Sequence, residues 1–109
     1  MDLLKINDGY AVSAQIQPED AAGLAKAGFV AVICNRPDGE DPGQPTAAEI
    51  QDACRAAGLE FHHVPVTGSY LTAESVLLHK SIIESAGGPV LGYCRSGQRS
   101  AMIYESGLS

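Results

Sequence analysis

Residues 89–101 read PVLGYCRSGQRSA, and the character of the chain changes at Cys94 in the middle of this stretch. The five residues before the cysteine are apolar or small and predict a buried strand that starts at Pro89. The residues after it are mostly polar, include a glycine, and lead into a short final helix predicted from Ser100 onward. A buried strand, a loop and a helix in this order form the repeating unit of parallel α/β sheets.

The remaining sequence continues this alternation of strands and helices. Asp8-Gly9, between apolar runs at 3–6 and 10–12, predicts an N-terminal hairpin. Further strands are predicted over 29–34 and 59–66, and helices over 18–28, 46–58 and 72–86, the second of these opened by a capping box at Thr46. The pattern predicts an α/β fold with a mainly parallel central sheet of about five strands and helices on both faces.

The length, hydrophobicity and net charge of the chain limit the kinds of molecule that it is expected to bind. The 109 residues suffice for one domain, and we expect residues 1–109 to form it, with a short or truncated C-terminal helix. No apolar run approaches the ~20 residues that span a bilayer, and no signal peptide is apparent, so we expect a cytoplasmic protein without membrane contacts. A net charge of −6 argues against a nucleic-acid partner. The oligomeric state stays open.

The cysteines and histidines do not predict a metal site or any cofactor. There are three cysteines, an odd number without a C-x-x-C pair, which argues against a disulfide framework or a zinc site. We expect Cys34 and Cys54 to pack in the core. His62 and His63 are neighbours on a strand and point to opposite faces, and His79 is expected on the exposed side of its helix.

The loop after the last predicted strand has the composition of an anion cradle. Successive backbone N–H groups that close onto a helix N-terminus bind anions, and Gly97 lets the chain bend there. Arg99 adds a planar fork of donors that fits a tetrahedral oxyanion. The same environment favours the thiolate of Cys94, and the Ser100 hydroxyl is a candidate hydrogen-bond donor to it. The remaining loop positions are Arg95, Ser96, Gly97 and Gln98, and we expect Arg95 to be exposed.

This order of residues resembles the cysteine phosphatase and rhodanese superfamilies. Cys94, Gly97, Arg99 and Ser100 match their signature of a cysteine after a buried strand, a glycine-containing loop, an arginine and a Ser or Thr. A tyrosine phosphatase has five residues between cysteine and arginine. This chain has four, a length that is common among rhodaneses.

Several other segments resemble the bacterial beta-lactamase-hydrolase-like, phosphatase-like domains, which have a dual-specificity or tyrosine-phosphatase-like fold. These segments are the Asp-Gly hairpin, 13–15 (SAQ), 32–40 (VICNRPDGE), 63–66 (HVPV) and Gly68, and together they extend over nearly the whole chain. The resemblance implies a cysteine-phosphatase-like fold with Cys94 as nucleophile.

The chain departs from dual-specificity phosphatases in one respect. Those enzymes take a general-acid aspartate from the loop that here reads TGSYL, residues 67–71, and holds no carboxylate. Asp38, Glu40 and Asp41 in the preceding long loop are alternative acids, although a solvated turn is the more usual role of such a cluster. Between Arg36 and Asp38 we expect a salt bridge that braces this loop rather than substrate contact.

Three functional hypotheses follow. The first is a phosphohydrolase that forms a phosphocysteine at Cys94, and the second is a sulfurtransferase that forms a persulfide there, because sulfur transfer needs no acid. The third is an anion-binding or interaction module without catalysis. The expected substrate is a phosphorylated or sulfur-donor small molecule or protein.

Overall fold

A five-stranded sheet forms the centre of the computed structural model, which describes residues 2–108. In chain order the elements are β1 (Leu3–Asn7), β2 (Tyr10–Ser13), α1 (Asp20–Lys26), β3 (Ala31–Cys34), α2 (Ala47–Ala56), β4 (Glu60–His63), α3 (Ala73–Ser85), β5 (Val90–Tyr93) and α4 (Gln98–Ser106). The spatial order of the strands is β1-β2-β5-β3-β4. Only the β1–β2 hairpin is antiparallel, and β2, β5, β3 and β4 are parallel.

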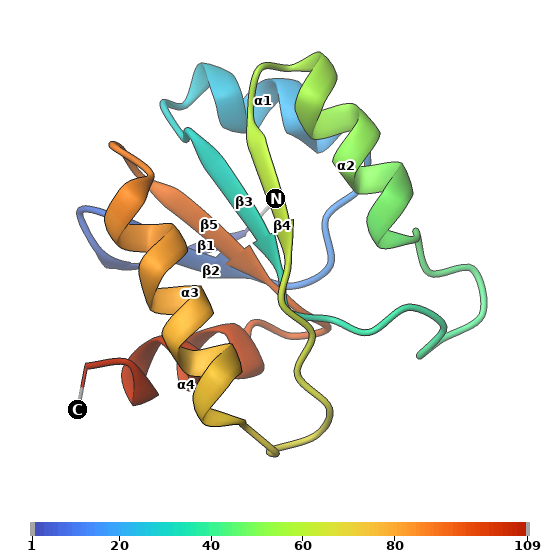
Figure 1. The fold of residues 1–109 in the computed structure, drawn as a ribbon. Coiled ribbons are helices and arrows are strands. Elements are labelled where there is room, and N and C mark those ends of the chain that lie inside the picture. The colour runs from blue at the N-terminus through green and yellow to red at the C-terminus, as the bar shows by residue number, and fades with distance from the viewer. Residues whose placement is uncertain (1, 109) are drawn as a thin grey trace.

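Helices cover both faces of this sheet, as the sequence predicts. Figure 1 shows α1 and α2 on one face and α3 and α4 on the other. Strand β3 explains why both layers are needed, because Val32 and Cys34 join the core under α1 and α2 while Ala31 and Ile33 join the core under α3 and α4. A parallel strand that is buried on both faces is apolar throughout.

Gly92 in β5 makes room for a residue of β2 that is important for the site. A Cβ atom at position 92 would lie 2.1 Å from the hydroxyl oxygen of Tyr10, which is closer than any non-bonded contact allows. The absence of a side chain at Gly92 therefore lets the Tyr10 ring cross the sheet surface toward α3 and α4.

The element ends follow local chemistry, and two predicted bounds are wrong. The strand predicted over 59–66 spans only Glu60–His63 and stops before Pro65, which has no N–H to donate. The capping box at Thr46 is present, with hydrogen bonds in both directions between Thr46 and Glu49. The final helix begins at Gln98, not at Ser100 as expected, because Gly97 has a φ of 97° and turns the chain into helical geometry two residues earlier. No helix within residues 2–108 has both the length and the apolar character that crossing a membrane requires.

Candidate active site

The loops that follow β3, β4 and β5 meet at one edge of the sheet. Parallel strands bring their carboxyl ends together, and this edge is where open α/β sheets bind ligands. Cys94 directly follows β5, and the loop 35–45 directly follows β3. An open hollow of about 520 Å³ lies there, and its lining residues are Glu40, Gly68, Arg95, Gln98 and Arg99.

Cys94 lies fully buried at the base of this loop cluster. The backbone N–H of Gly97 donates to its Sγ at 3.0 Å. Burial by itself raises the pKa of the Cys94 thiol, but the backbone N–H groups of Ser100, Ser96, Gly97 and Arg99 outweigh burial and lower the pKa below its ordinary value. Four donors converging on one sulfur stabilise a thiolate.

One detail of the cradle differs from the sequence-based expectation. The Ser100 hydroxyl has no hydrogen-bond partner within residues 2–108, so Ser100 acts on the sulfur through its backbone N–H and not its side chain. The N–H of Gln98 donates to the Ser96 hydroxyl at 3.3 Å. A Cβ atom at position 97 would lie 3.4 Å from the backbone of Ser13, and the left-handed conformation of Gly97 favours glycine.

Arg99 is held in place by acceptors on one side of its guanidinium. Its Nη1 donates to Glu40 Oε2 and to the Val66 carbonyl oxygen, both at 2.8 Å, and its Nη2 donates to Glu40 Oε1 at 2.8 Å. The bidentate pair with Glu40 uses one N–H of Nη1 and one of Nη2, at the end of the guanidinium. The Nε–H and the second N–H of Nη2 point to one side of the group, which is called its side edge below. Glu40 first, and to a smaller extent the Cys94 sulfur, raise the pKa of Arg99.

A second arginine, Arg36, also donates a hydrogen bond to Glu40. Arg36 is 4% exposed, and donates from Nε to Glu40 Oε1 at 3.0 Å, from Nη1 to Gln15 Oε1 at 3.0 Å and from Nη2 to Asp41 Oδ2 at 2.6 Å. Arg95 is exposed, as expected, and its Nε lies 3.3 Å from the same Asp41 oxygen. The loop after β3 is therefore tied to the cradle by Glu40 and Asp41, which join three arginines.

The expected salt bridge between Arg36 and Asp38 is wrong in its acidic partner. Asp38 Oδ1 accepts the N–H of Ala47 at 2.8 Å and so caps the N-terminus of α2. The bracing role of Arg36 is confirmed, with Glu40 and Asp41 as its partners.

Glu40 is the carboxylate that lines the hollow, and it is not protonated at neutral pH. The hydrogen bond from Arg99 is the largest cause that lowers its pKa, and with that from Arg36 it brings the pKa to about 2 despite partial burial. A carboxyl whose pKa is lowered on folding stabilises the fold above its ordinary pKa. The contribution of the Glu40–Arg99 pair to stability is therefore fully present above about pH 4.5 and is lost as the pH falls toward 2.

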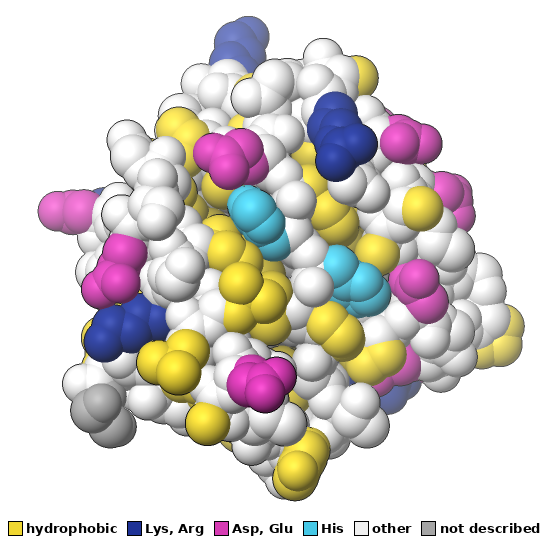
Figure 2. Space-filling view, in the orientation of Figure 1, with side chains coloured by type: hydrophobic (Ala, Val, Ile, Leu, Met, Phe, Trp, Pro, Cys, Tyr) yellow, Lys and Arg dark blue, Asp and Glu magenta, His cyan; other side chains and the backbone are white. Residues whose placement is uncertain are grey.

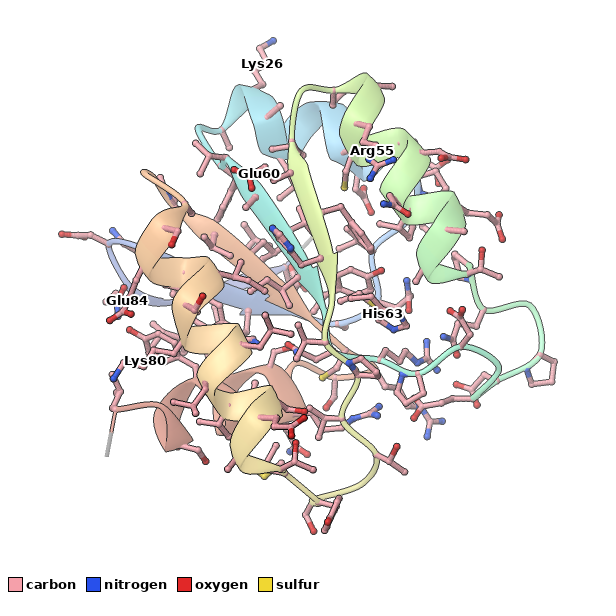
Figure 3. The ribbon with its side chains drawn as sticks, viewed as in Figure 1. Lys26, Arg55, Glu60, His63, Lys80 and Glu84 are labelled. Atoms are coloured by element: carbon pink, nitrogen blue, oxygen red, sulfur yellow. The ribbon has the colours of Figure 1, made fainter. Side chains whose placement is uncertain are left out.

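The expectation that His79 is exposed is wrong. Its side chain is 1% exposed and faces the sheet with Ile82, three residues further along α3. The i, i+3 spacing of these two residues was a signal for an inward position. The histidines of β4 lie at the surface instead (Figure 2). His63 is at the carboxyl end of that strand (Figure 3), and its Nε2 lies 3.0 Å from the Arg36 carbonyl oxygen.

The other cysteines, and Tyr70 in the loop after β4, do not add to the site. Cys34 and Cys54 are buried free thiols in the core, as expected. Tyr70, in the loop after β4, is 74% exposed and is not among the residues that line the hollow. Within residues 2–108 no group of three or more His, Cys, Asp or Glu side chains is arranged to hold a metal ion.

Proteins of known structure share this fold. A candidate phosphatase from Neisseria meningitidis has a structure that superposes with a TM-score of 0.86 at 37% identity, over 95% of this chain and 74% of that one. TpbA from P. aeruginosa, solved in complex with pTyr, superposes with a TM-score of 0.68 at 17% identity, over 93% of this chain and 58% of that one, which shows a shared fold.

Sequence relatives point in the same direction. A beta-lactamase hydrolase-like protein from Xylella fastidiosa is 36% identical over 104 residues, which make up 95% of this chain and 24% of that protein. The chain thus spans about a quarter of the length of this relative. The family model described as "Beta-lactamase hydrolase-like protein, phosphatase-like domain" matches residues 2–108. This chain therefore belongs to the beta-lactamase hydrolase-like, phosphatase-like domain family.

Proposed function

We propose that this domain is a cysteine-dependent phosphohydrolase in which Cys94 is the nucleophile. The observation that carries the proposal is the cradle itself: four backbone N–H groups lower the pKa of the buried Cys94 thiol, beside Arg99, which Glu40 and the Val66 carbonyl oxygen hold in place. The family supports phosphatase chemistry, and TpbA, with the same fold, was solved with pTyr. None of the proteins named above is described as a sulfurtransferase.

The reaction has two displacement steps. The Cys94 thiolate attacks phosphorus, the S–P bond forms, and the bond to the leaving oxygen breaks with its electron pair on that oxygen, which takes a proton from solvent. Water then attacks the phosphocysteine, the S–P bond breaks, and phosphate and the thiolate are released while solvent accepts the proton. The cradle N–H groups and the Nε and Nη2 donors of Arg99 bind the three non-bridging oxygens in both steps.

The covalent intermediate provides the test. Rapid quenching during turnover of p-nitrophenyl phosphate, followed by mass analysis of the peptides, is expected to find one phosphoryl group on Cys94. A phosphoryl group on another residue, or steady hydrolysis without any phosphoenzyme, would contradict the proposal. The peptides that carry Cys34 and Cys54 serve as internal controls, because both thiols are buried in the core away from the cradle.

Substitution of Glu40 by glutamine is expected to lower kcat/KM for the same substrate by roughly 10–100-fold, because a misplaced binding group costs about that much. A neutral amide cannot accept both bonds from Arg99, whose side edge would then turn away from the cradle. Steady-state kinetics of Glu40→Gln beside Glu49→Gln, a change in the exposed cap of α2, give the comparison. Equal rates for Glu40→Gln and the wild type would show that Arg99 does not depend on this clamp.

A further inference from the structure

A chain of hydrogen bonds runs through the buried side of α3 and ends at the cradle. Both ring nitrogens of His79 have partners: Nδ1 lies 3.3 Å from Asn35 Nδ2, and Nε2 lies 3.1 Å from the Tyr10 hydroxyl. The Tyr10 hydroxyl also donates to the carbonyl oxygen of Ser100 at 3.0 Å. Lys80, the next residue, points away from the sheet (Figure 3), so His79 is the inward-facing polar side chain of this helix.

The hydrogen bonds at the two ends of this series determine which ring nitrogen of His79 carries the proton. Asn35 Nδ2 donates to the Val64 carbonyl oxygen at 2.9 Å, which orients the amide with its NH₂ group toward His79. Nδ1 of His79 must then accept, so the proton is on Nε2 and is donated to the Tyr10 oxygen. Tyr10 in turn gives its only proton to Ser100. Burial lowers the pKa of His79 to about 4, which agrees with a neutral ring.

Asn35 also reaches the site by a second route. Its backbone oxygen accepts the N–H of Val66 at 2.9 Å, and the Val66 oxygen accepts from Arg99 Nη1 at 2.8 Å. The first route ends at Ser100, whose N–H is among the donors that lower the pKa of Cys94. Both routes therefore end in the first turn of α4, one at the arginine and one at the residue after it.

We propose that His79, as the neutral Nε2–H tautomer, is a positioning residue of the active site. It couples Asn35 to Tyr10 and so holds the first turn of α4 at the angle where the Ser100 N–H points to the Cys94 sulfur and Arg99 presents its side edge. It touches neither the substrate nor the sulfur. The inference rests on the proposed phosphatase function for its kinetic readout. The pH dependence of Cys94 alkylation tests it independently of that function.

Three substitutions at His79 distinguish a role of its hydrogen bonds to Asn35 and Tyr10 from a role in core packing alone. Glutamine retains a donor near the Nε2 position for Tyr10, asparagine retains an acceptor near the Nδ1 position for Asn35, and leucine retains volume with neither. Tyr10→Phe removes the donor to Ser100 while it keeps the ring. His62→Gln, at the surface on β4, is the matched control. Each variant is compared by urea unfolding, by kcat and KM for p-nitrophenyl phosphate, and by the pH dependence of Cys94 alkylation by iodoacetamide.

The expected result is a kcat about 10–100-fold lower in His79→Leu and Tyr10→Phe at a nearly unchanged KM, because misalignment reduces rate by about this factor. The alkylation midpoint of Cys94 moves to higher pH in the same variants. His79→Gln retains more of both properties than His79→Leu, and His62→Gln matches the wild type. In the wild type, ¹⁵N spectra are expected to place the imidazole proton on Nε2.

Lower stability in His79→Leu and Tyr10→Phe with wild-type kcat and an unmoved alkylation midpoint would overturn the inference, since His79 would then only pack. A proton on Nδ1 would overturn it as well. A wild-type protein without Cys94-dependent hydrolysis would instead contradict the proposed function, and the alkylation midpoint would still decide whether His79 positions the cradle.

Discussion

Cys94→Ser is expected to reduce the hydrolysis of p-nitrophenyl phosphate by on the order of 10⁵-fold, the scale seen when a catalytic nucleophile is removed. A serine hydroxyl at this position stays protonated, because the donors that lower the pKa of a thiol cannot bring an alcohol into the neutral range. The measurement is phosphate release at saturating substrate by wild-type and variant proteins that have been compared by urea unfolding.

The cradle should survive this change, which gives the experiment a second readout. The four N–H donors belong to the backbone, and Arg99 is held by Glu40 and Val66, so Cys94→Ser is expected to bind the substrate with little loss of affinity. Cys54→Ala, which alters a core thiol on the buried face of α2, is the matched control and should retain its turnover. Hydrolysis by Cys94→Ser within tenfold of the wild-type rate would exclude Cys94 as the nucleophile.

Benzyl phosphate is expected to be hydrolysed about 10²–10⁴-fold more slowly than phenyl phosphate, a range that corresponds to the contribution of a positioned general acid. The carboxylate that lines the hollow, Glu40, has a pKa of about 2 and is paired with two arginines. Asp41 pairs with Arg36 and Arg95, and Asp38 caps α2. A leaving alkoxide must therefore depart without a proton from these residues, whereas a phenoxide is far less basic.

The two esters are similar in size and differ mainly in the basicity of the leaving oxygen, so a difference in kcat/KM reports on protonation. Substituted phenyl phosphates extend the comparison, and a steep decrease of kcat/KM with rising pKa of the phenol is expected. Equal kcat/KM values for benzyl and phenyl phosphate would show that a general acid acts in this site. That outcome would leave the role of Cys94 intact, because the first experiment tests the nucleophile independently.

Much of the fold could be read from local patterns. The Asp8-Gly9 hairpin, the capping box at Thr46 and the apolar run before Cys94 depend on short stretches whose chemistry acts within a few residues. Alternation of strands and helices then leads to a parallel sheet, whose carboxyl edge brings Cys94 and the loop after β3 together. Cys94 and Arg99 could be expected to lie close together for the same reason, since only four residues separate them.

Two of the errors concern the hydrogen-bond partners of polar side chains. Arg36 pairs with Glu40 and Asp41 and not with Asp38, because α2 presents an unsatisfied N–H that takes the Asp38 carboxylate. His79 was expected at the surface, where a titratable side chain on a helix usually lies. It is buried because Asn35 and Tyr10, 44 and 69 residues away, satisfy both of its ring nitrogens.

The sequence by itself determined the order of the elements, the family resemblance and the position of the Cys94–Arg99 segment after the last strand, because each of these is encoded in contiguous residues. Only the tertiary structure decided which carboxylate clamps Arg99, which donors reach Cys94, and what holds the first turn of α4 in place. These features depend on hydrogen bonds between segments that come together when the sheet forms. A buried polar group must find a partner wherever the fold provides one, and sequence spacing does not reveal where that will be.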